Sequence, residues 1–393
     1  MNNQNIEDWK YTNIEALLKT KYNIPKVISG DASIKSQIQS FLFSTESSIT
    51  ILFQNGQLNQ ALSNFKEESE LEIAELKDSK LSASEVQTLQ EITASLKDNE
   101  ICSYQNTLPV KGMFIRAKKS SSKNKIVNIV YLQNNNDEAD LVSPVRNLII
   151  AEENSNLKVV ETFISNTDIK YLSNPLTQII CKSDAIVEHN KVLLEGKECV
   201  HLGLLQIVQA ANSHFISNYF AFGGKTIRNE IHPILAGEHE NCLLNGLTVI
   251  KGEQHVDNFT VIDHSKPNCF SREIYKGIYA DKSTGAFSGT IIVRQDAQKT
   301  NAIQSNKSLL LSDDATINSR PQLKIYADDV KCTHGATVGQ LDEDSMFYLR
   351  ARGIGEKDAR NMLINAFASD TLEHITIDEL KEILHLEIDK ALA

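Results

Sequence analysis

Cys332 and His334 give the clearest chemical signal in the chain, because a thiol and an imidazole stand two positions apart. The surrounding run, IYADDVKCTHGATVG, is rich in β-branched residues and predicts a strand. Alternate residues of a strand face the same side, so both side chains would project together from Cα atoms roughly 6.5–7 Å apart. A thiolate and an imidazole that converge in this way can both ligate iron. The alternative interpretation is a buried cysteine beside a histidine that only forms hydrogen bonds.

Two ligands are too few for an iron–sulfur cluster, which takes about four. The next candidate ligands along the chain, Asp342 and Glu343, follow the glycine-containing segment after the predicted strand. We therefore expect any metal role of Cys332 and His334 to depend on ligands from distant parts of the chain or from a second polypeptide.

The segment FGGKT at 222–226 suggests a phosphate loop at first sight. The Walker A pattern needs a glycine five positions before its second glycine, and Tyr219 occupies that position. No helix pattern follows whose N-terminus could bind phosphate. The segment is therefore predicted to be a tight turn between strands, and the chain itself is not expected to bind ATP.

The remaining histidines and cysteines show no metal-binding pattern. Six histidines, at positions 189, 201, 214, 239, 255 and 264, fall in or near turns without an H-E-x-x-H motif. We expect them to lie at the surface or to form hydrogen bonds. Apart from Cys332, the cysteines are isolated and are expected to be small buried residues.

The elements that must position these residues are mostly short strands. From about residue 104 to 338, runs of Val, Ile, Leu, Thr and Phe alternate with polar turns, as in IVNIVYL, LKVVETFI and GTIIVR. Helix-length amphipathic segments are absent between them, which excludes a doubly wound α/β sheet.

A repeat of about 29 residues runs through this region. The apolar residues that follow similar polar turns are Leu157, Ile186, Phe215 and Leu243, continued by Phe287 and Ile317. Repeats of this length without helices predict a mainly β fold, a right-handed parallel β-helix in which each coil stacks on the last. The alternative is a β-sandwich with hairpins, for which Asn245-Gly246 is the main turn signal.

Both ends of the chain are predicted to be helical. Residues 7–20 contain apolar positions at helical spacing, and Ser82-Ala83-Ser84-Glu85 is a capping box that opens another helix. After Gln340, helices are expected over 344–352, ended by Gly353, over 357–367, and over 380–391. We therefore expect an N-terminal helical domain (1–103), a β-helix core (104–340) and a C-terminal helical domain (341–393).

Composition narrows the class of protein further. Forty basic and fifty-one acidic residues give a net charge of −11, which disfavours nucleic acid or an anionic membrane surface as the main partner. No apolar run approaches the roughly 18 residues of a membrane span, and the first residues resemble neither a signal peptide nor a transit peptide. We expect a cytoplasmic protein without disulfides.

Several stretches resemble the SufB/SufD family, the scaffold subunits of the SUF iron–sulfur cluster assembly machinery. The run IYADDVKCTHGATVGQLDEDSMFYLRARG at 325–353 is similar to the family's C-terminal signature, and the segment from Asp257 to Cys332 is similar to its late coils, as is LNGLTVIKGEQHVDN before it. EDWKYTNI near the start resembles an E-x-W-K/R-Y-T motif of SufD-type members. This motif, the chain length and the lack of an N-terminal cysteine cluster make the chain more similar to the SufD branch than to the SufB branch.

The resemblance implies a non-catalytic scaffold subunit of a cluster assembly complex. SufD-type members pair with a SufB-type subunit through their last coils and bind a SufC-type ABC ATPase through their C-terminal helices. His334 matches the family's histidine implicated beside a SufB cysteine at a transient iron–sulfur cluster, and Cys332 matches a second family position. The residues expected to bind the ATPase are Ser345, Met346, Phe347, Tyr348, Leu349, Arg350, Arg352 and Gly353.

Two other functions stay open on the sequence alone. One is a SufB-like chain that forms homodimers and holds the cluster without a second subunit type. The other is a β-helix polysaccharide lyase using Asp328 and Asp329, which is disfavoured because neighbouring strand residues face opposite sides. The sequence also leaves open whether the chain binds flavin, supplies iron, or only shapes the SufB site.

Overall fold

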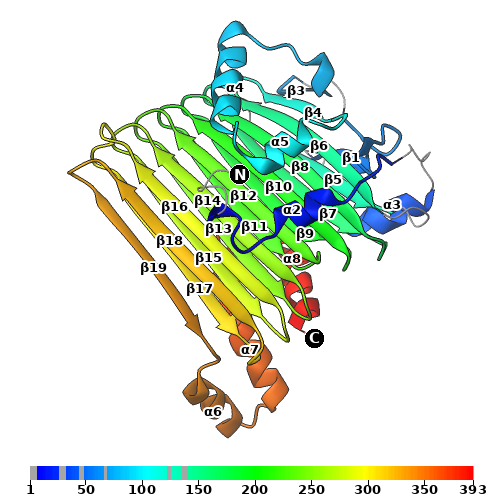
Figure 1. Ribbon diagram of the computed structural model, residues 1–393, viewed down its shortest axis with the longest axis vertical. Helices are drawn as coiled ribbons and strands as arrows, with labels where there is room; N and C mark the ends of the chain where they lie inside the picture. Colours follow the sequence, from blue (N-terminus) through cyan, green and yellow to red (C-terminus); the bar gives the residue numbers. More distant parts are fainter. Residues whose placement is uncertain are drawn as a thin grey trace.

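The structure is a computed structural model that describes residues 7–25, 32–43, 48–65, 69–121, 125–134 and 140–392. Its core is a solenoid built from two sheets (Figure 1). From β4 on, successive strands of the chain belong alternately to one sheet and to the other. The ten-stranded sheet consists, in spatial order, of β2 (Gln57–Leu58), β1 (Ser48–Gln54), β5 (Ile126–Gln133), β7 (Asn156–Ser165), β9 (Ile186–Leu194), β11 (His214–Ala221), β13 (Asn241–Ile250), β15 (Phe270–Tyr279), β17 (Asn301–Leu310) and β19 (Lys331–Gly339). The nine-stranded sheet consists of β3 (Leu71–Glu75), β4 (Met113–Ala117), β6 (Leu141–Ala151), β8 (Tyr171–Cys181), β10 (Cys199–Gln209), β12 (Thr226–Leu235), β14 (His255–His264), β16 (Thr284–Val293) and β18 (Thr316–Ile325).

Neighbouring strands within each sheet run parallel, except for β1 with β2 and β3 with β4, which run antiparallel. The predicted parallel β-helix is therefore confirmed, and the sandwich alternative is wrong. Asn245-Gly246 forms no hairpin turn, because both residues lie within β13. There the Asn245 amide donates to Asn218 on the previous coil, 3.0 Å away.

Polar turn residues set the length of each coil. From β7 to β19, the strands of the ten-stranded sheet begin at residues 156, 186, 214, 241, 270, 301 and 331. The turn before each of the first six contains a residue in the left-handed conformation, and these residues are Asn154, Asp184, Asn212, His239, Asn268 and Lys299. Asn and Asp tolerate this conformation because their short side chains can bond the local backbone. The predicted repeat is confirmed by this spacing.

The positions predicted within the repeat are partly wrong. Phe287 and Ile317 lie on β16 and β18 of the nine-stranded sheet, so they do not continue the series of the ten-stranded sheet. In two other coils the register differs from the prediction by one residue. Leu157 aligns with Val187 and Phe215, and Phe215 aligns with Cys242. Ile186 and Leu243 therefore face the opposite side, since neighbouring strand residues alternate between faces. Both positions were misassigned because each is followed or preceded by another apolar residue, which hides the alternation.

The interior of the solenoid is one continuous apolar core to which both sheets contribute their inward-facing residues. Helices cover parts of both outer faces. They are α2 (Ile14–Lys19), α3 (Ala32–Ile38), α4 (Ala83–Ser95), α5 (Glu100–Gln105), α6 (Glu343–Ala351), α7 (Glu356–Ser369) and α8 (Asp378–Leu392), with 3-10 turns η1 (Gln39–Phe41), η2 (Leu76–Asp78) and η3 (Asp370–Leu372). Among the described residues, no helix is both long and apolar enough to cross a membrane.

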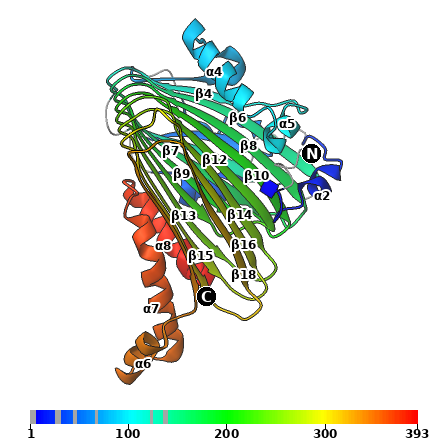
Figure 2. The same cartoon turned by 60° about the vertical axis from the view of Figure 1, so that its left-hand side comes forward.

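The outer face of the nine-stranded sheet is covered by N-terminal helices, and that of the ten-stranded sheet by the C-terminal helices together with α3, whose Ile34 and Ile38 pack on its first strands. Figure 2 shows α2, α4 and α5 on one side of the solenoid and α7 and α8 on the other. Residues of α2 and α5 pack on β6, β8 and β10 of the nine-stranded sheet. The C-terminal helices pack on the ten-stranded sheet, where Leu380, Leu384 and Ile388 join a buried cluster with Val192 and Phe220.

The expectation that the first hundred residues are wholly helical is wrong. β1, β2 and β3 lie there, and β1 pairs with β5 as part of the ten-stranded sheet. The helix expected over 7–20 is also interrupted, because the chain turns after Asp8 and α2 begins only at Ile14. The capping box at Ser82 is confirmed, since Ser82 and Glu85 bond each other's backbone at the start of α4.

The interruption after Asp8 places Trp9 on the nine-stranded sheet. Its ring lies 4.4 Å from the guanidinium of Arg228 on β12. Arg228 also donates to Asp257 at 2.7 Å, and the hydroxyl of Thr12 donates to the same carboxylate at 2.7 Å. The W-K-Y-T segment therefore anchors the start of the chain to the middle of the solenoid.

Candidate functional site at the open end of the solenoid

Cys332 and His334 lie on β19, the last strand of the ten-stranded sheet (Figure 1). In this sheet β19 pairs with β17, where Ala302 is opposite Cys332 and Gln304 is opposite His334. Within the described part of the chain, no strand pairs with the other edge of β19. The predicted strand and the shared face of the two side chains are confirmed, whereas their metal role stays a prediction.

The face that the two side chains share is the inner face of the solenoid. Cys332 packs against the inner core, next to the fully buried Ala302. Gln304, the neighbour of His334, is only 1% exposed. Because no further coil covers β19, Cys332 is half-buried and His334 is exposed. Two ligand-type side chains thus point into an end of the solenoid that this chain leaves open.

Partial burial raises the pKa of the Cys332 thiol, and a hydrogen bond to the backbone of Ala302 opposes this effect. The thiol is therefore the prevailing form at neutral pH, and binding a metal would have to displace its proton.

Cys332 and His334 are two candidate ligands without a third beside them in the described part of the chain. Among the residues that the structure describes, no three His, Cys, Asp or Glu side chains lie close enough together to hold a metal ion. The expectation that further ligands come from distant parts of the chain or from a second polypeptide stays a prediction.

The open end also presents apolar surface. Ile303 on β17 and Val338 on β19 are exposed, as are Ile325 at the end of β18 and Tyr326, which is 62% exposed. An unpaired strand edge with exposed apolar side chains is the kind of surface that another chain covers. The end of the solenoid therefore has the features of a protein–protein interface around the Cys332 and His334 pair.

The residues predicted to bind an ATPase lie on α6 and just after it. α6 ends at Ala351, Arg352 follows as its cap, and Gly353 has φ +85°, as predicted for the residue that ends this helix. Phe347 and Tyr348 are 76% and 56% exposed, and Arg350, Arg352 and Gly353 are exposed as well. Ser345, Met346 and Leu349 are partly buried. The helix thus offers an aromatic and basic surface to solvent.

α6 projects from the body of the molecule, whereas the helices after it are fixed to the solenoid (Figures 1 and 2). Lys276 on β15 donates to the Phe367 carbonyl of α7 at 2.7 Å and forms an ion pair with Asp370. Glu188 on β9 accepts from the Thr376 backbone at 3.0 Å. Three residues connect β19 to the start of α6, so the candidate ligand pair and the exposed helix are close neighbours along the chain.

Sequence reasoning missed a second pair with the same spacing, Cys199 and His201 on β10. Both are fully buried. The imidazole of His201 lies 2.7 Å from the Glu195 carboxylate, and burial lowers the pKa of His201. Burial also raises the pKa of Cys199 well above its ordinary value. The matching C-x-H spacing at 199–201 was visible in the sequence, but burial cannot be read from two positions.

The other histidines are exposed or hydrogen-bonded and the other cysteines are buried, as predicted, but His189 lies inside β9 and not in a turn. His189 and His264 are buried and lie 2.7 Å from Glu161 and 2.8 Å from Ser271, respectively. His255 bonds Thr284 at 2.7 Å, while His214 and His239 are exposed. The five cysteines other than Cys332 are buried.

The segments that suggested phosphate binding and polysaccharide cleavage form turns of the solenoid. The segment 222–226 is the corner between β11 and β12, where Gly224 has φ +86°, Thr226 begins a strand and Lys225 pairs with Glu198 at 2.7 Å. Asp328 and Asp329 lie in the turn between β18 and β19 rather than on a strand, which corrects the expected position. Asp329 forms an ion pair with Lys299 there.

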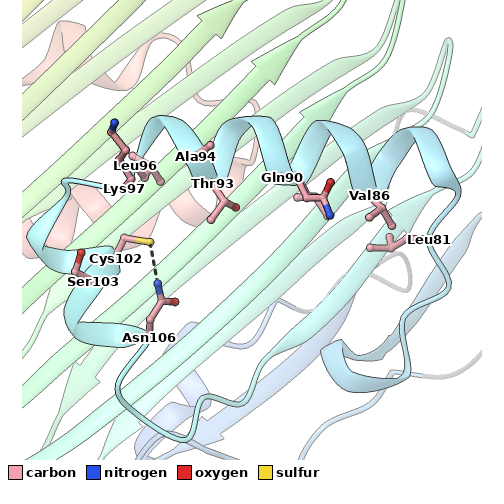
Figure 3. A pocket seen from close by; sticks show the side chains of 11 residues that line it. Leu81, Val86, Gln90, Thr93, Ala94, Leu96, Lys97, Cys102, Ser103 and Asn106 are labelled. Carbon is pink, nitrogen blue, oxygen red and sulfur yellow. Dashed lines mark hydrogen bonds between the residues drawn. The ribbon is translucent and has the colours of Figure 1, made fainter.

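An open groove of about 550 Å³ lies between α4 and α5, lined by Leu81, Val86, Leu96 and Cys102 among others (Figure 3). Cys102 is buried, and burial raises its pKa, so this thiol has little tendency to react or to bind metal. The groove is apolar and far along the solenoid from β19, and it contributes nothing to the Cys332 and His334 site.

Comparison with known proteins identifies a family. Residues 131–367, more than half of the chain, match the family model described as the SufBD core domain of SUF system FeS cluster assembly. The chain is 30% identical over 380 residues to the iron–sulfur cluster assembly protein SufD of Escherichia coli, covering 96% of this chain and 86% of that protein.

Two further relatives extend the range of organisms. An iron–sulfur cluster assembly SufBD family protein of Synechocystis is 28% identical over 386 residues, covering 95% of this chain and 84% of that protein. The chloroplastic protein ABCI7 of Arabidopsis thaliana is 34% identical over 243 residues, covering 61% of this chain and 51% of that protein.

Proposed function

The chain belongs to the SufBD family of the SUF system, on its SufD side, and has a role in iron–sulfur cluster assembly; on this premise we propose that it is a scaffold subunit without catalytic activity of its own. In this proposal its open solenoid end pairs with a SufB-type subunit in the cytoplasm. A nascent cluster is the cargo held at the junction of the two chains. ATP is bound by a SufC-type ATPase that docks on the C-terminal helices, and not by this chain.

The observation that supports the pairing is the position of Cys332 and His334 on the open inner face of β19. A closed site would need further ligands, and the described part of this chain offers no third one nearby. A partner strand that continued the ten-stranded sheet past β19 would bring its own inward side chains against them. It would also cover the exposed apolar side chains at this end.

The surface that supports ATPase docking is α6. Phe347 and Tyr348 are large aromatic side chains on an exposed helix, and aromatic and arginine side chains are enriched at protein interfaces. Because three residues separate α6 from β19, a movement of α6 would be passed directly to the strand that holds the ligand pair.

The main test is His334→Ala in the complex reconstituted with its SufB-type and SufC-type partners under anaerobic conditions. We expect the complex to form at normal stoichiometry while the iron and sulfide content falls at least about tenfold, the usual loss when a metal site loses a ligand or its support. Normal cluster formation by this variant would disprove the role of His334.

Docking of the ATPase is tested by deleting residues 341–393 and by Phe347→Ala. The deletion should abolish recovery of the ATPase while pairing with the SufB-type subunit persists. Phe347→Ala should weaken ATPase binding by more than 1 kcal/mol, as expected for a central aromatic contact. Recovery of the ATPase with the deleted chain would show that it docks elsewhere.

Iron and sulfide analysis of the purified chain also distinguishes the SufB-like alternative from the proposed function. A homodimer of this chain alone that contains iron and sulfide would favour a scaffold without a second subunit type. The polysaccharide lyase has no support left, because the family is established and the two aspartates lie in a turn, one of them in an ion pair.

A further inference from the structure

A buried amide sits directly behind His334 on the inner face of the solenoid. Glu273 on β15, Gln304 on β17 and His334 on β19 are aligned across three successive strands. Neighbouring strands are about 4.8 Å apart, so each side chain of this row lies within reach of the next. Glu273 and Gln304 are 0% and 1% exposed, and His334 completes the row at the open end.

The orientation of the Gln304 amide is determined by Glu273. The Gln304 nitrogen Nε2 donates to Glu273 Oε2 at 2.7 Å. Burial raises the pKa of Glu273 to about 7, with this hydrogen bond acting in the opposite direction. Above that pH the carboxylate can only accept, which fixes Nε2 on the Glu273 side.

The oxygen of the same amide does not take part in this hydrogen bond and is available to a second partner. Gln304 Oε1 is buried and has no hydrogen-bond partner among the described residues. A buried acceptor without a partner is unfavourable, so Oε1 would gain from accepting a hydrogen bond.

Gly289 makes room for this arrangement. A Cβ atom at Gly289 on β16 would lie 2.2 Å from Gln304 Nε2, so any larger residue would displace the amide. Glu273 and Gly289 thus hold the Gln304 amide in place on the strand next to His334.

We propose that Gln304 is a positioning residue for His334: its Oε1 accepts the ring N–H that His334 does not use for the cluster, with Glu273 and Gly289 holding the amide in place. Histidine ligands usually donate their second ring nitrogen to a carbonyl or carboxylate, which fixes the ring and the nitrogen that faces the metal. This inference rests on the proposed role of His334 and adds the group that orients it.

The test uses cobalt(II) as the probe, added to the complete anaerobic complex at pH 8, with the ligand-field bands of the bound metal as readout. His334→Ala defines the background. Gln304→Met removes the acceptor at nearly constant volume and should weaken cobalt binding by about 10- to 100-fold and change the band pattern. The exchange variant Glu273→Gln with Gln304→Glu keeps both the internal hydrogen bond and an oxygen facing His334, and should restore binding.

Asn306→Leu is the matched control. Asn306 is on the same strand, faces the same interior and also has a buried oxygen without a partner, but it is aligned with Ala336 instead of His334. It should leave cobalt affinity and cluster content unchanged. If Gln304→Met does not fold, Gly289→Ala takes its place, because the added methyl group would displace the amide.

The outcomes separate the two proposals. If His334→Ala binds cobalt and forms clusters as well as the unchanged chain, the role of His334 itself is wrong. If His334→Ala loses both, while Gln304→Met or Gly289→Ala behaves like the Asn306→Leu control, only the positioning role of Gln304 is overturned. Failure of the exchange variant to restore binding would likewise count against it.

Discussion

The chain contains two Cys-x-His pairs with opposite surroundings. Cys199 and His201 lie on β10 in the middle of the solenoid, where coils on both sides bury them completely. Cys332 and His334 lie on β19, with one neighbouring coil and an open edge. The residue types, the spacing and the strand geometry are the same, so the difference in availability comes entirely from the position in the stack.

Burial gives Cys199 and His201 a structural role. The His201 imidazole is held by Glu195, and the Cys199 thiol is kept protonated by its surroundings. The outer pair is held less firmly. Among the described residues His334 forms no hydrogen bond, and the half-buried Cys332 bonds only the backbone of Ala302. The comparison teaches that a ligand motif in a solenoid becomes a candidate site when stacking stops beyond it.

The largest expected effect that tests this contrast is on stability. His201→Ala should lower the free energy of unfolding by about 3–5 kcal/mol, because Glu195 would lose its partner in a buried position. His334→Ala should change it by no more than about 0.5 kcal/mol, since the side chain is exposed. Urea unfolding followed by circular dichroism measures both. Equal losses would mean that the two positions do not differ in the way the structure shows.

A smaller effect is expected from a second buried group of the middle coils, Glu240. Burial raises the pKa of this carboxyl to about 8, against 4.5 for the ordinary group, although the Gly237 N–H opposes this. The folded chain therefore keeps a proton that the unfolded chain releases, and its stability falls as pH rises from about 5 to about 8, then levels off. Glu240→Gln should remove this component and be more stable than the unchanged chain at pH 8 by about 2 kcal/mol or more.

Glu238→Gln is the control for this experiment, because Glu238 is exposed in the same turn. It should leave the difference in unfolding free energy between pH 5 and pH 8 unchanged. A Glu240→Gln variant that retained the full pH dependence of the unchanged chain would contradict the assignment.

The smallest expected effect is a difference in the rate at which cysteines of the native chain are chemically labelled. Cys332 should react with a thiol reagent at pH 8 at least about tenfold faster than the buried cysteines, which must wait for local opening. Mass spectrometry after short exposure locates the label, and Cys332→Ser should remove most of it. Labelling of Cys199 at a similar rate would show that the middle coils open readily, and would weaken the contrast between the two pairs.

Much of the architecture could be predicted from local patterns. Polar turns with Asn and Asp, short β-branched runs and a period near 29 residues predict a solenoid, and the end of α6 at Gly353 follows from local chemistry alone. The errors fell where local patterns are ambiguous. Ile186 and Leu243 were placed in the wrong register because an apolar residue lies next to each. β3 was missed because its partner β4 lies far along the chain. β1 was missed although a local signal was present, since Asn55-Gly56 forms the hairpin turn that joins it to β2.

The amino-acid sequence was enough to predict the repeat, the fold class and a pair of side chains of the types that ligate iron, because these depend on residue type and on spacing along one strand. Which Cys-x-His pair is accessible, and which amide is the neighbour of His334, became clear from the fold. Those facts depend on the stacking of strands some 30 residues apart, and on the place where stacking ends. Solvent exposure and hydrogen-bond partners are properties of neighbouring coils, and a single segment of sequence does not contain its neighbours.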